Sequence, residues 1–344
     1  MNPEQRKQFT DDHLNHLCDL LSCKVLKQFS SFSNIVYHVI KKDESLELVL
    51  RISHSENRSI EWVEEEISWL LHLHNTIPDF TANKPLKNND KYIQVVKADK
   101  VEFYAVAFSL VKGLNFLDID PSNRSQVYEN IGRLNGKMHK ATKTFTPGKV
   151  KRFTYIDEYC IKPYTTYKTE LQQKYPFIDE KYHLLMNQIT KFHEENPEDF
   201  GLIHGDIQPS NYLIDRNTLQ PYLFDFDASC YCHYVMDVSN IVFYGIVRHE
   251  NHTKEEVDFI LKSFLKGYKE EYQLVNEDKV MSMIDAYLWL RLTITFIYFL
   301  PHNTEPFTSL KTALLHDLEN SKNFIDCTYL HQVRDLIVQM NKSN

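Results

Sequence analysis

The sequence predicts an α+β fold of two lobes, in which a small β-rich N-terminal lobe precedes a larger, mostly helical C-terminal lobe. Runs of β-branched and aromatic residues recur between positions 24 and 108 and enclose one helical pattern. Helical patterns dominate from Gln126 onward. The chain has 344 residues, enough for each lobe to bury its own core. We expect the lobes to span residues 1–110 and 111–344.

The elements of the first lobe follow from residue type and spacing. A short helix is expected from Asp11 to Leu21, with Thr10 as its N-cap. A longer helix is expected from Ser59 to Asn75. The β-rich runs predict five strands, which are Lys24–Phe29, Ile35–Ile40, Leu46–Ile52, Tyr92–Lys97 and Tyr104–Phe108.

The longer helix carries one carboxylate on its apolar side. At about 100° per residue, one broad arc is formed by Trp62, Val63, Ile67, Trp69, Leu70, Leu71 and Leu73. Glu66 falls inside this arc, whereas the other glutamates, Glu61, Glu64 and Glu65, fall outside it. A buried carboxylate is costly unless it is paired, and the nearest upstream cation is Arg51, on the third strand. We expect an Arg51–Glu66 pair; the alternative is a solvent-pointing arginine and a glutamate at the helix rim.

Composition and charge argue against several classes of protein. The net charge of −8 argues against a general nucleic-acid binder. The six cysteines show no disulfide framework, so we expect reduced thiols and a cytoplasmic location. The first seven residues are polar and do not resemble a secretory signal. The apolar stretch Leu288 to Leu300 is interrupted by Arg291 and is shorter than the ~20 residues that cross a bilayer, so we expect a core helix and no membrane partner. Nothing in the sequence indicates the oligomeric state.

Two acidic motifs in the second lobe predict a phosphoryl-transfer centre. The first runs from His204 to Asn211 (HGDIQPSN), and the second is Asp225-Phe226-Asp227. Asp206 precedes Asn211 by five residues, the separation that kinases place between a catalytic aspartate and an asparagine. A carboxylate accepts the proton of an attacking hydroxyl, and carboxylate and amide oxygens bind Mg²⁺ on nucleotide phosphates.

The segment between the motifs is expected to bring their metal ligands together. Two apolar runs, Tyr212–Ile214 and Tyr222–Phe224, flank a turn-like stretch at 215–218, so a hairpin is expected. Its open end would place Asn211 beside Asp225, as a shared metal ion requires. The alternative is a set of loop aspartates and a capping asparagine that bind no metal.

With His-Gly-Asp in place of His-Arg-Asp, and Asp-Phe-Asp in place of Asp-Phe-Gly, the motifs resemble those of the aminoglycoside phosphotransferase and choline kinase-like family. The resemblance implies a protein kinase-like fold, ATP and Mg²⁺ as cofactors, and Asp206 as the catalytic base. It implies that Asn211 and Asp225 hold the metal, with Asp227 as a second metal contact. It further implies that Asp237 hydrogen-bonds the backbone of the catalytic loop; the alternative for Asp237 is a plain N-cap.

The first lobe departs from the kinase pattern where the nucleotide is expected. Kinases pair a strand lysine with a helix glutamate and set the lysine on the nucleotide phosphates. Here Arg51 stands in the place of that lysine, and with Glu66 as its partner it is expected to contact phosphates. The glycine-rich phosphate loop is also missing, since no glycine occurs before residue 113.

A polar turn and a hinge complete the expected nucleotide site. The turn at 30–34 reads Ser-Ser-Phe-Ser-Asn, and Ser33 and Asn34 are expected to serve the phosphates through backbone N–H groups and hydroxyls. The alternative is an ordinary hairpin turn. Adenine is expected to lie against backbone groups of the hinge, from Ser109 to Val111.

Together these features favour an ATP-dependent phosphotransferase that moves the γ-phosphate to a hydroxyl of a small molecule. Only nine residues separate Asp227 from Asp237, too few for the peptide platform of a protein kinase. Two alternatives stay open: a Ser/Thr protein kinase of the same fold, and a non-catalytic nucleotide-binding scaffold. The acceptor is not indicated, and aminoglycosides, choline-like amines, sugars and amino alcohols are all compatible.

Three further groups of residues each allow two interpretations. Four tyrosines either line an acceptor pocket or are ordinary packing residues, namely Tyr155, Tyr159, Tyr164 and Tyr167. Five acidic residues either line a pocket for a cation or belong to a solvated face, namely Asp157, Glu158, Glu270, Glu271 and Asp285. A third group either binds zinc or lies in a plain loop, and it consists of Cys230, Cys232 and His233. We expect the plain loop, because no second Cys/His pair has matching spacing.

Overall fold

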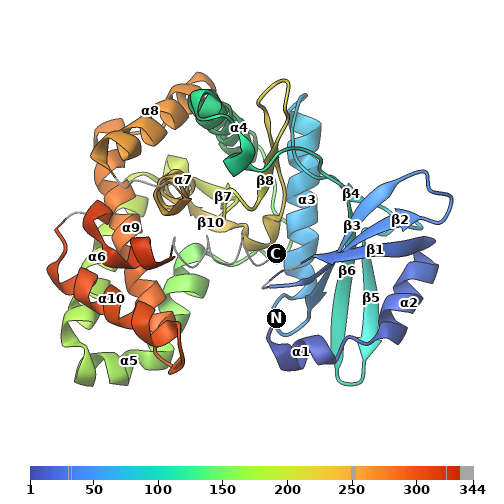
Figure 1. Cartoon of the computed structure of the whole chain (residues 1–344), viewed down its shortest axis with the longest axis horizontal. Helices are drawn as coiled ribbons and strands as arrows, with labels where there is room; N and C mark the ends of the chain where they lie inside the picture. Colours follow the sequence, from blue (N-terminus) through green and yellow to red (C-terminus); the bar gives the residue numbers. More distant parts are fainter. Residues whose placement is uncertain (30, 32, 249–252, 323, 334–344) are drawn as a thin grey trace. The chain divides into compact units, whose positions relative to one another are not determined.

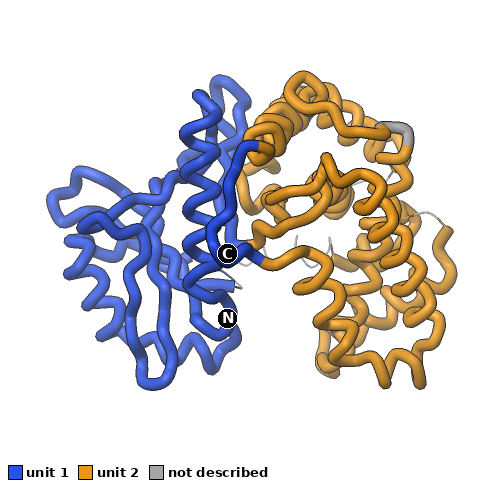
Figure 2. Tube along the Cα trace, turned by 180° about the vertical axis from the view of Figure 1, so that it is seen from behind, with its two compact units in different colours: residues 1–114, 144–152, 213–227 blue, residues 115–143, 153–212, 228–344 orange. Residues whose placement is uncertain are grey.

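The chain folds as two units, and each is assembled from separate stretches of sequence (Figure 1, Figure 2). The computed structural model describes residues 1–344 except 30, 32, 249–252, 323 and 334–344. Unit 1 comprises residues 1–114, 144–152 and 213–227; unit 2 comprises residues 115–143, 153–212 and 228–344. The expected lobes, 1–110 and 111–344, were two uninterrupted stretches, whereas unit 1 also takes in two segments from the later part of the chain.

An antiparallel sheet forms the framework of unit 1. Its strands are β1 (Cys23–Phe29), β2 (Ile35–Lys41), β3 (Glu47–His54), β4 (Pro85–Leu86), β5 (Ile93–Ala98) and β6 (Val101–Ser109). The strand order is β1-β2-β3-β6-β4, and β5 also pairs with β6. All five predicted strands are present; the two-residue strand β4 was not predicted because it begins at a proline and has no alternating pattern.

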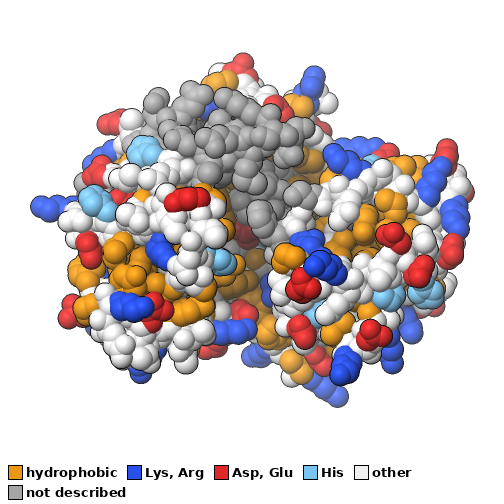
Figure 3. All heavy atoms as spheres, turned by 60° about the horizontal axis from the view of Figure 1, so that its bottom comes forward, with side chains coloured by type: hydrophobic (Ala, Val, Ile, Leu, Met, Phe, Trp, Pro, Cys, Tyr) orange, Lys and Arg blue, Asp and Glu red, His pale blue; other side chains and the backbone are white. Residues whose placement is uncertain are grey.

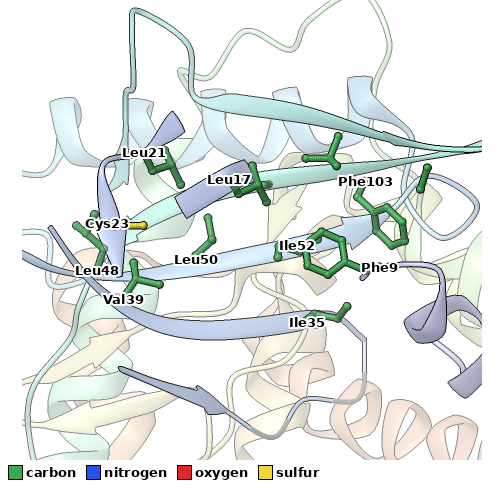
Figure 4. Packing of buried hydrophobic residues seen from close by; sticks show 13 residues of the cluster. Phe9, Leu17, Leu21, Cys23, Ile35, Val39, Leu48, Leu50, Ile52 and Phe103 are labelled. Atoms are coloured by element: carbon green, nitrogen blue, oxygen red, sulfur yellow. The ribbon is translucent and has the colours of Figure 1, made fainter. Parts of the chain in front are cut away.

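Three helices belong to unit 1, namely α1 (Pro3–Lys7), α2 (Asp11–Leu20) and α3 (Ile60–Thr76). The predicted cap, Thr10, precedes α2. Ser59 was expected inside the longer helix but is the N-cap of α3, where its hydroxyl accepts a hydrogen bond from the backbone of Trp62 at 3.3 Å. The apolar side chains of α2 pack with those of β1, β2, β3 and β6 (Figure 4). Leu17, Leu50 and Ile52 are fully buried in this core.

Unit 2 is mainly helical. Its longer helices are α4 (Arg124–Thr142), α5 (Lys162–Lys174), α6 (Pro176–Glu195), α7 (Val235–Arg248), α8 (Lys254–Glu271), α9 (Glu277–Phe299) and α10 (Phe307–Asn320). Its short turns of helix are η1 (Phe116–Asp118), η2 (Pro121–Asn123), η3 (Ile156–Ile161), η4 (Pro197–Asp199) and η6 (Phe324–Asp326). A further turn, η5 (Phe226–Ala228), begins in the 213–227 segment of unit 1. Helices α4 and α8 approach closely at glycines, since a Cβ atom on Gly132 or Gly267 would collide with the backbone of the other helix. The predicted α+β class is therefore confirmed.

Two small antiparallel pairs frame the acidic motifs. Strands β7 (Phe200–Ile203) and β10 (Cys230–His233) pair with each other, and β8 (Tyr212–Ile214) pairs with β9 (Pro221–Leu223). The predicted hairpin between Asn211 and Asp225 is thus present, with its second strand one residue earlier than expected.

Helix α9 is longer than the apolar stretch that predicted it. It is long and apolar enough to cross a membrane, but 67% of its apolar window is buried inside the chain. It packs against α5, α6, α7 and α10, which matches the expected core helix. Basic and acidic side chains are interspersed over the face that Figure 3 presents, in agreement with the small net charge.

Candidate active site

The predicted pair between β3 and α3 is present in unit 1. Arg51 donates to the two carboxylate oxygens of Glu66 at 2.7 and 2.9 Å, and the side chains are 6% and 0% exposed. Burial disfavours the charged form of Arg51 and by itself would lower its pKa. The negative charges of Glu66 and Asp227 together have the larger effect, so the Arg51 pKa is raised. The parallel two-bond geometry is one that a lysine cannot make.

Glu65 was expected to lie outside the apolar arc, and this expectation is wrong. Its side chain is buried and accepts a hydrogen bond from the backbone N–H of Arg152. The spacing of apolar residues could not reveal this, because the partner is a main-chain group 87 positions away. Glu64 is exposed, as expected.

Arg152 was missed by the sequence reasoning. It is fully buried and belongs to the 144–152 segment of unit 1. Its guanidinium donates to the carbonyl oxygens of Trp62 and Asp227, each at 2.6 Å, and lies 3.4 Å from an oxygen of Glu66. One side chain therefore contacts both α3 and the segment that follows β9.

Asp227 is held by a second arginine. Arg58 donates to both carboxylate oxygens, from Nε at 3.2 Å and from Nη2 at 3.1 Å. Burial works against ionisation, but the charges of Arg58, Arg51 and Arg152 outweigh it and lower the Asp227 pKa to about 2. The expected metal contact of Asp227 gains no support from this geometry, since both oxygens already accept from Arg58.

Asp225 has an uncommon backbone conformation. Its φ is 63°, in the left-handed region that non-glycine residues rarely occupy. The next residue, Phe226, is buried edge-on against Trp69 of α3, with ring centroids 5.8 Å apart. A strained residue fixed by packing of its neighbour is a pattern that clusters at functional sites.

The expected phosphate turn is only partly described, because Ser30 and Phe32 lie outside the described residues. Ser33 is exposed. Asn34 is buried, and its side-chain oxygen accepts from the Ser53 hydroxyl at 2.8 Å. Its backbone does not have the positive φ that the prediction allowed. The Asn34 side chain therefore fastens the turn to β3, and the expectation that it serves phosphates gains no support.

The hinge follows β6. The backbone N–H of Ser109 donates to Lys84 at 2.9 Å, and its hydroxyl accepts from the Lys84 backbone at 2.8 Å. Within the described part of the chain, Leu110 and Val111 make no backbone–backbone hydrogen bond. The groups left for an adenine ring are therefore those of Leu110 and Val111, not the N–H of Ser109.

In unit 2, a buried aspartate anchors the loop of the first acidic motif, residues 204–211. Asp237 accepts from the backbone N–H groups of His204 at 3.1 Å and Gly205 at 2.9 Å. Asn135 donates to it at 3.1 Å, and His139 lies 3.3 Å away. Burial opposes the Asp237 charge, but the hydrogen bond and charge of His139 outweigh it and lower the pKa. The role implied by the resemblance is confirmed, and the N-cap alternative is wrong because Asp237 is the third residue of α7.

Gly205 gives the loop its shape. Its φ is +79°, and a Cβ atom there would lie 2.5 Å from the carbonyl oxygen of Ala228. The glycine of His-Gly-Asp is thus required both by conformation and by the close approach of the segment after the second motif.

Asp206 is held by hydrogen bonds at both carboxylate oxygens. Oδ1 accepts from the Tyr244 hydroxyl at 3.0 Å, and Oδ2 accepts from Gln208 at 2.7 Å and from the Asn211 amide at 2.9 Å. Asn211 also donates to the Asp206 carbonyl at 2.9 Å. With its nitrogen used in this way, Asn211 has its side-chain oxygen left as a ligand atom.

Tyr244 and Arg291 support Asp206 and were not predicted. Arg291 donates to the Tyr244 oxygen and to Asn240, each at 2.5 Å, and Asn240 donates to the Gly205 carbonyl at 2.8 Å. Burial and the neighbouring carboxylate raise the Tyr244 pKa, despite the charge of Arg291, so its hydroxyl stays a donor. The one signal in the sequence was Arg291 itself, a charge that interrupts the apolar stretch from Leu288 to Leu300.

Several of the remaining candidate residues have structural partners. Cys230, Cys232 and His233 form the buried strand β10, so the expectation of a loop is wrong. Tyr164 stacks on Tyr182 at 4.1 Å and hydrogen-bonds Asp179, which makes it a packing residue. The acidic residues scatter over different ion pairs and turns, such as Glu158–Lys162, Glu270–Arg133 and Asp157–Thr154.

Comparisons with known proteins point to one enzyme family. A family model described as the phosphotransferase enzyme family matches residues 25–278. Amicoumacin kinase of Bacillus subtilis (strain 168) is 29% identical over 277 residues, which cover 78% of this chain and 77% of that protein.

Two solved structures are similar over almost the whole chain. An amicoumacin kinase in complex with AMP-PNP and Ca²⁺ has a TM-score of 0.79 at 19% identity, covering 97% of this chain and 100% of that one. A microcompartment-associated aminopropanol kinase has a TM-score of 0.68 at 18% identity, covering 97% and 98%. These likenesses show the kinase-like fold. Since the family model spans well over half of the sequence, the chain belongs to the phosphotransferase enzyme family.

Proposed function

We propose that this protein transfers the γ-phosphate of ATP to a hydroxyl group of a small molecule, with Asp206 as the base. The observation that carries the proposal is the fixed carboxylate: both oxygens of Asp206 accept hydrogen bonds, on a loop whose backbone is anchored by Asp237. A base held in one orientation is what proton transfer from an attacking hydroxyl requires. The proton of the acceptor would pass to a carboxylate oxygen of Asp206.

The proposed metal ligands are Asn211 and Asp225, which flank the hairpin of β8 and β9. An amide oxygen and a carboxylate are the donors that a hard divalent cation takes. Mg²⁺, when bound, would neutralise charge on the nucleotide phosphates. An amicoumacin kinase of the same fold was solved with AMP-PNP and Ca²⁺, which supports a nucleotide and a divalent ion in this family.

The proposed phosphate contact is Arg51, positioned by Glu66. Two of its five N–H groups bind Glu66, and its buried Nε has no hydrogen-bond partner among the described residues, so further donors remain. Ser33 is kept as a second phosphate contact, and the adenine ring is assigned to Leu110 and Val111 of the hinge. In this scheme residues 1–110 bind the nucleotide, and residues 111–344 supply catalysis and the acceptor site.

The proposed acceptor is a small hydroxyl-bearing compound, with amino alcohols first among the candidates. The relatives named above are kinases of amicoumacin and of aminopropanol. The interval from Asp227 to Asp237 also supports a small acceptor over a protein: four of its nine residues form the strand β10, paired with β7, where a protein kinase has its peptide platform. A cytoplasmic location, with all six cysteines free, is part of the proposal.

The test offers γ-labelled ATP with Mg²⁺ to a panel of amino alcohols, choline-like amines, aminoglycosides and sugars, with generic protein substrates in parallel. Asp206→Asn serves as the inactive control. We expect label in at least one metabolite and none in protein. Labelled protein without labelled metabolite would favour the Ser/Thr protein kinase, and nucleotide binding without any transfer would favour the scaffold.

A further inference from the structure

A cluster of three arginines and three carboxylates lies in unit 1, buried except for the partly exposed Arg58, and is larger than the proposed mechanism requires. Arg51, Arg58 and Arg152 face the carboxylates Glu65, Glu66 and Asp227. The Arg51–Glu66 pair matches the kinase scheme, whereas Arg152 has no counterpart in the motifs from which the site was predicted. Its role has to be derived from its contacts.

Arg152 joins two elements that carry separate parts of the proposed site. On α3 it contacts Glu66, which holds Arg51, and it also donates to the carbonyl of Trp62 one turn earlier. On the second motif it donates to the carbonyl of Asp227 at 2.6 Å, two residues after Asp225. The backbone N–H of Arg152 donates to Glu65, so the residue is fixed to α3 by main chain and side chain together.

The second motif is held from two sides as a result. Arg58 binds the carboxylate of Asp227 and Arg152 binds its carbonyl, so neither end of this residue can turn independently. This restraint stands two residues from the left-handed backbone of Asp225. The orientation of the proposed metal ligand therefore depends on contacts that α3 makes through Arg152.

Stability alone is a weak reason for such an arrangement. Burial lowers the Arg152 pKa, which marks the cost of keeping a guanidinium away from water. Replacing buried ion pairs by well-packed apolar residues is often neutral or stabilising. A fully buried arginine that spans two functional segments is better explained by the geometry that it imposes.

We propose that Arg152 is a positioning residue that couples the phosphate contact, Arg51 with Glu66, to the metal-ligand segment around Asp225. This inference rests on the proposed function. It assigns Arg152 to the nucleotide and metal side of the reaction and gives it no contact with the acceptor. Replacing Arg152 should weaken the binding of Mg-ATP and leave the affinity for the acceptor unchanged.

The test compares Arg152→Lys and Arg152→Met with Lys149→Met, a change at an exposed lysine of the same 144–152 segment. Calorimetric titration of ATP with and without Mg²⁺ is the first readout. We expect Mg-ATP affinity to fall roughly 10-fold or more in both Arg152 variants, because lysine cannot reach α3 and Asp227 in one fork. The KM of the acceptor should stay within about 2-fold, and Lys149→Met should match the wild type. Low-millimolar guanidinium should restore part of the Mg-ATP affinity of Arg152→Met.

A measurement on the unaltered protein guards against variants that fail to fold. Hydrogen exchange should show that Mg-ATP protects α3, residues 225–228 and the 148–153 segment together. Protection of α3 without the 148–153 segment, or unchanged Mg-ATP affinity in folded Arg152 variants, would overturn the inference. If the wild type itself binds no Mg-ATP, the proposed function fails instead, so the two failures are distinguishable.

Discussion

Glu66→Gln tests the central pair of unit 1. The side chain is fully buried and accepts from Arg51 at 2.7 and 2.9 Å, with Arg152 at 3.4 Å. Glutamine has nearly the same shape but one acceptor oxygen, so at least one charge-assisted hydrogen bond worth about 1.5–3 kcal/mol is lost. Breaking a buried ion pair by removing one partner costs about 3–5 kcal/mol. We expect the free energy of unfolding to fall by about 3 kcal/mol.

Urea denaturation followed by tryptophan fluorescence suits this test, because Trp62 and Trp69 lie on the same helix as Glu66. With a slope of about 1–3 kcal/mol per molar urea, the midpoint should shift by roughly 1–3 M. Glu64→Gln is the matched control, since Glu64 is exposed on α3 and its change should cost at most about 0.5 kcal/mol. A change at Glu65 is unsuitable as this control because the Glu65 side chain is buried. If Glu66→Gln and Glu64→Gln unfold alike, the argument for a buried pair is refuted.

Three further changes test other parts of the site. Asp225→Ala should abolish the Mg²⁺-dependent part of nucleotide binding in calorimetry; unchanged metal dependence would mean that the metal is held elsewhere. The pKa of Asp227 is about 2, compared with an ordinary value of 3.8. The ionised carboxylate therefore stabilises the fold by about 2 kcal/mol above pH ~4, and this stabilisation is lost as the pH falls towards 2. Asp227→Asn should therefore be less stable at pH 7, with a gap to the wild type that narrows below pH ~4; a constant gap would contradict the assignment. Tyr244→Phe removes one hydrogen bond to Asp206, worth about 1 kcal/mol, and should lower kcat several-fold without changing nucleotide affinity, whereas an unchanged kcat would show that Tyr244 does not position the base.

The elements that could be predicted are those with strong local periodicity. Alternating β-branched residues and the apolar arc of α3 were enough to predict β3, α3 and the position of Glu66, because their pattern repeats within a few residues. The fixed separation of Asp206 and Asn211, and the runs that flank Asp225, likewise lie within one short stretch of chain.

The residues that could not be predicted depend on partners distant in sequence. Arg152 binds backbone carbonyls 90 and 75 positions away, and Glu65 binds the backbone of Arg152, so neither has a local pattern. Tyr244 lies in an apolar helix and is typical of a core residue until the position of Asp206 is known. Asn34 was assigned to phosphates from turn chemistry alone, whereas its side chain is used by Ser53 of a neighbouring strand.

The most direct test of the account is a comparison of wild type and Asp206→Asn in a single turnover of γ-labelled ATP. The acceptor would be a metabolite that the wild type labels. We predict that transfer falls roughly 10²–10⁴-fold, the usual contribution of a positioned base, while Mg-ATP affinity measured by calorimetry stays within about 3-fold. Transfer at a near wild-type rate by Asp206→Asn would contradict the assignment of Asp206 as the catalytic base.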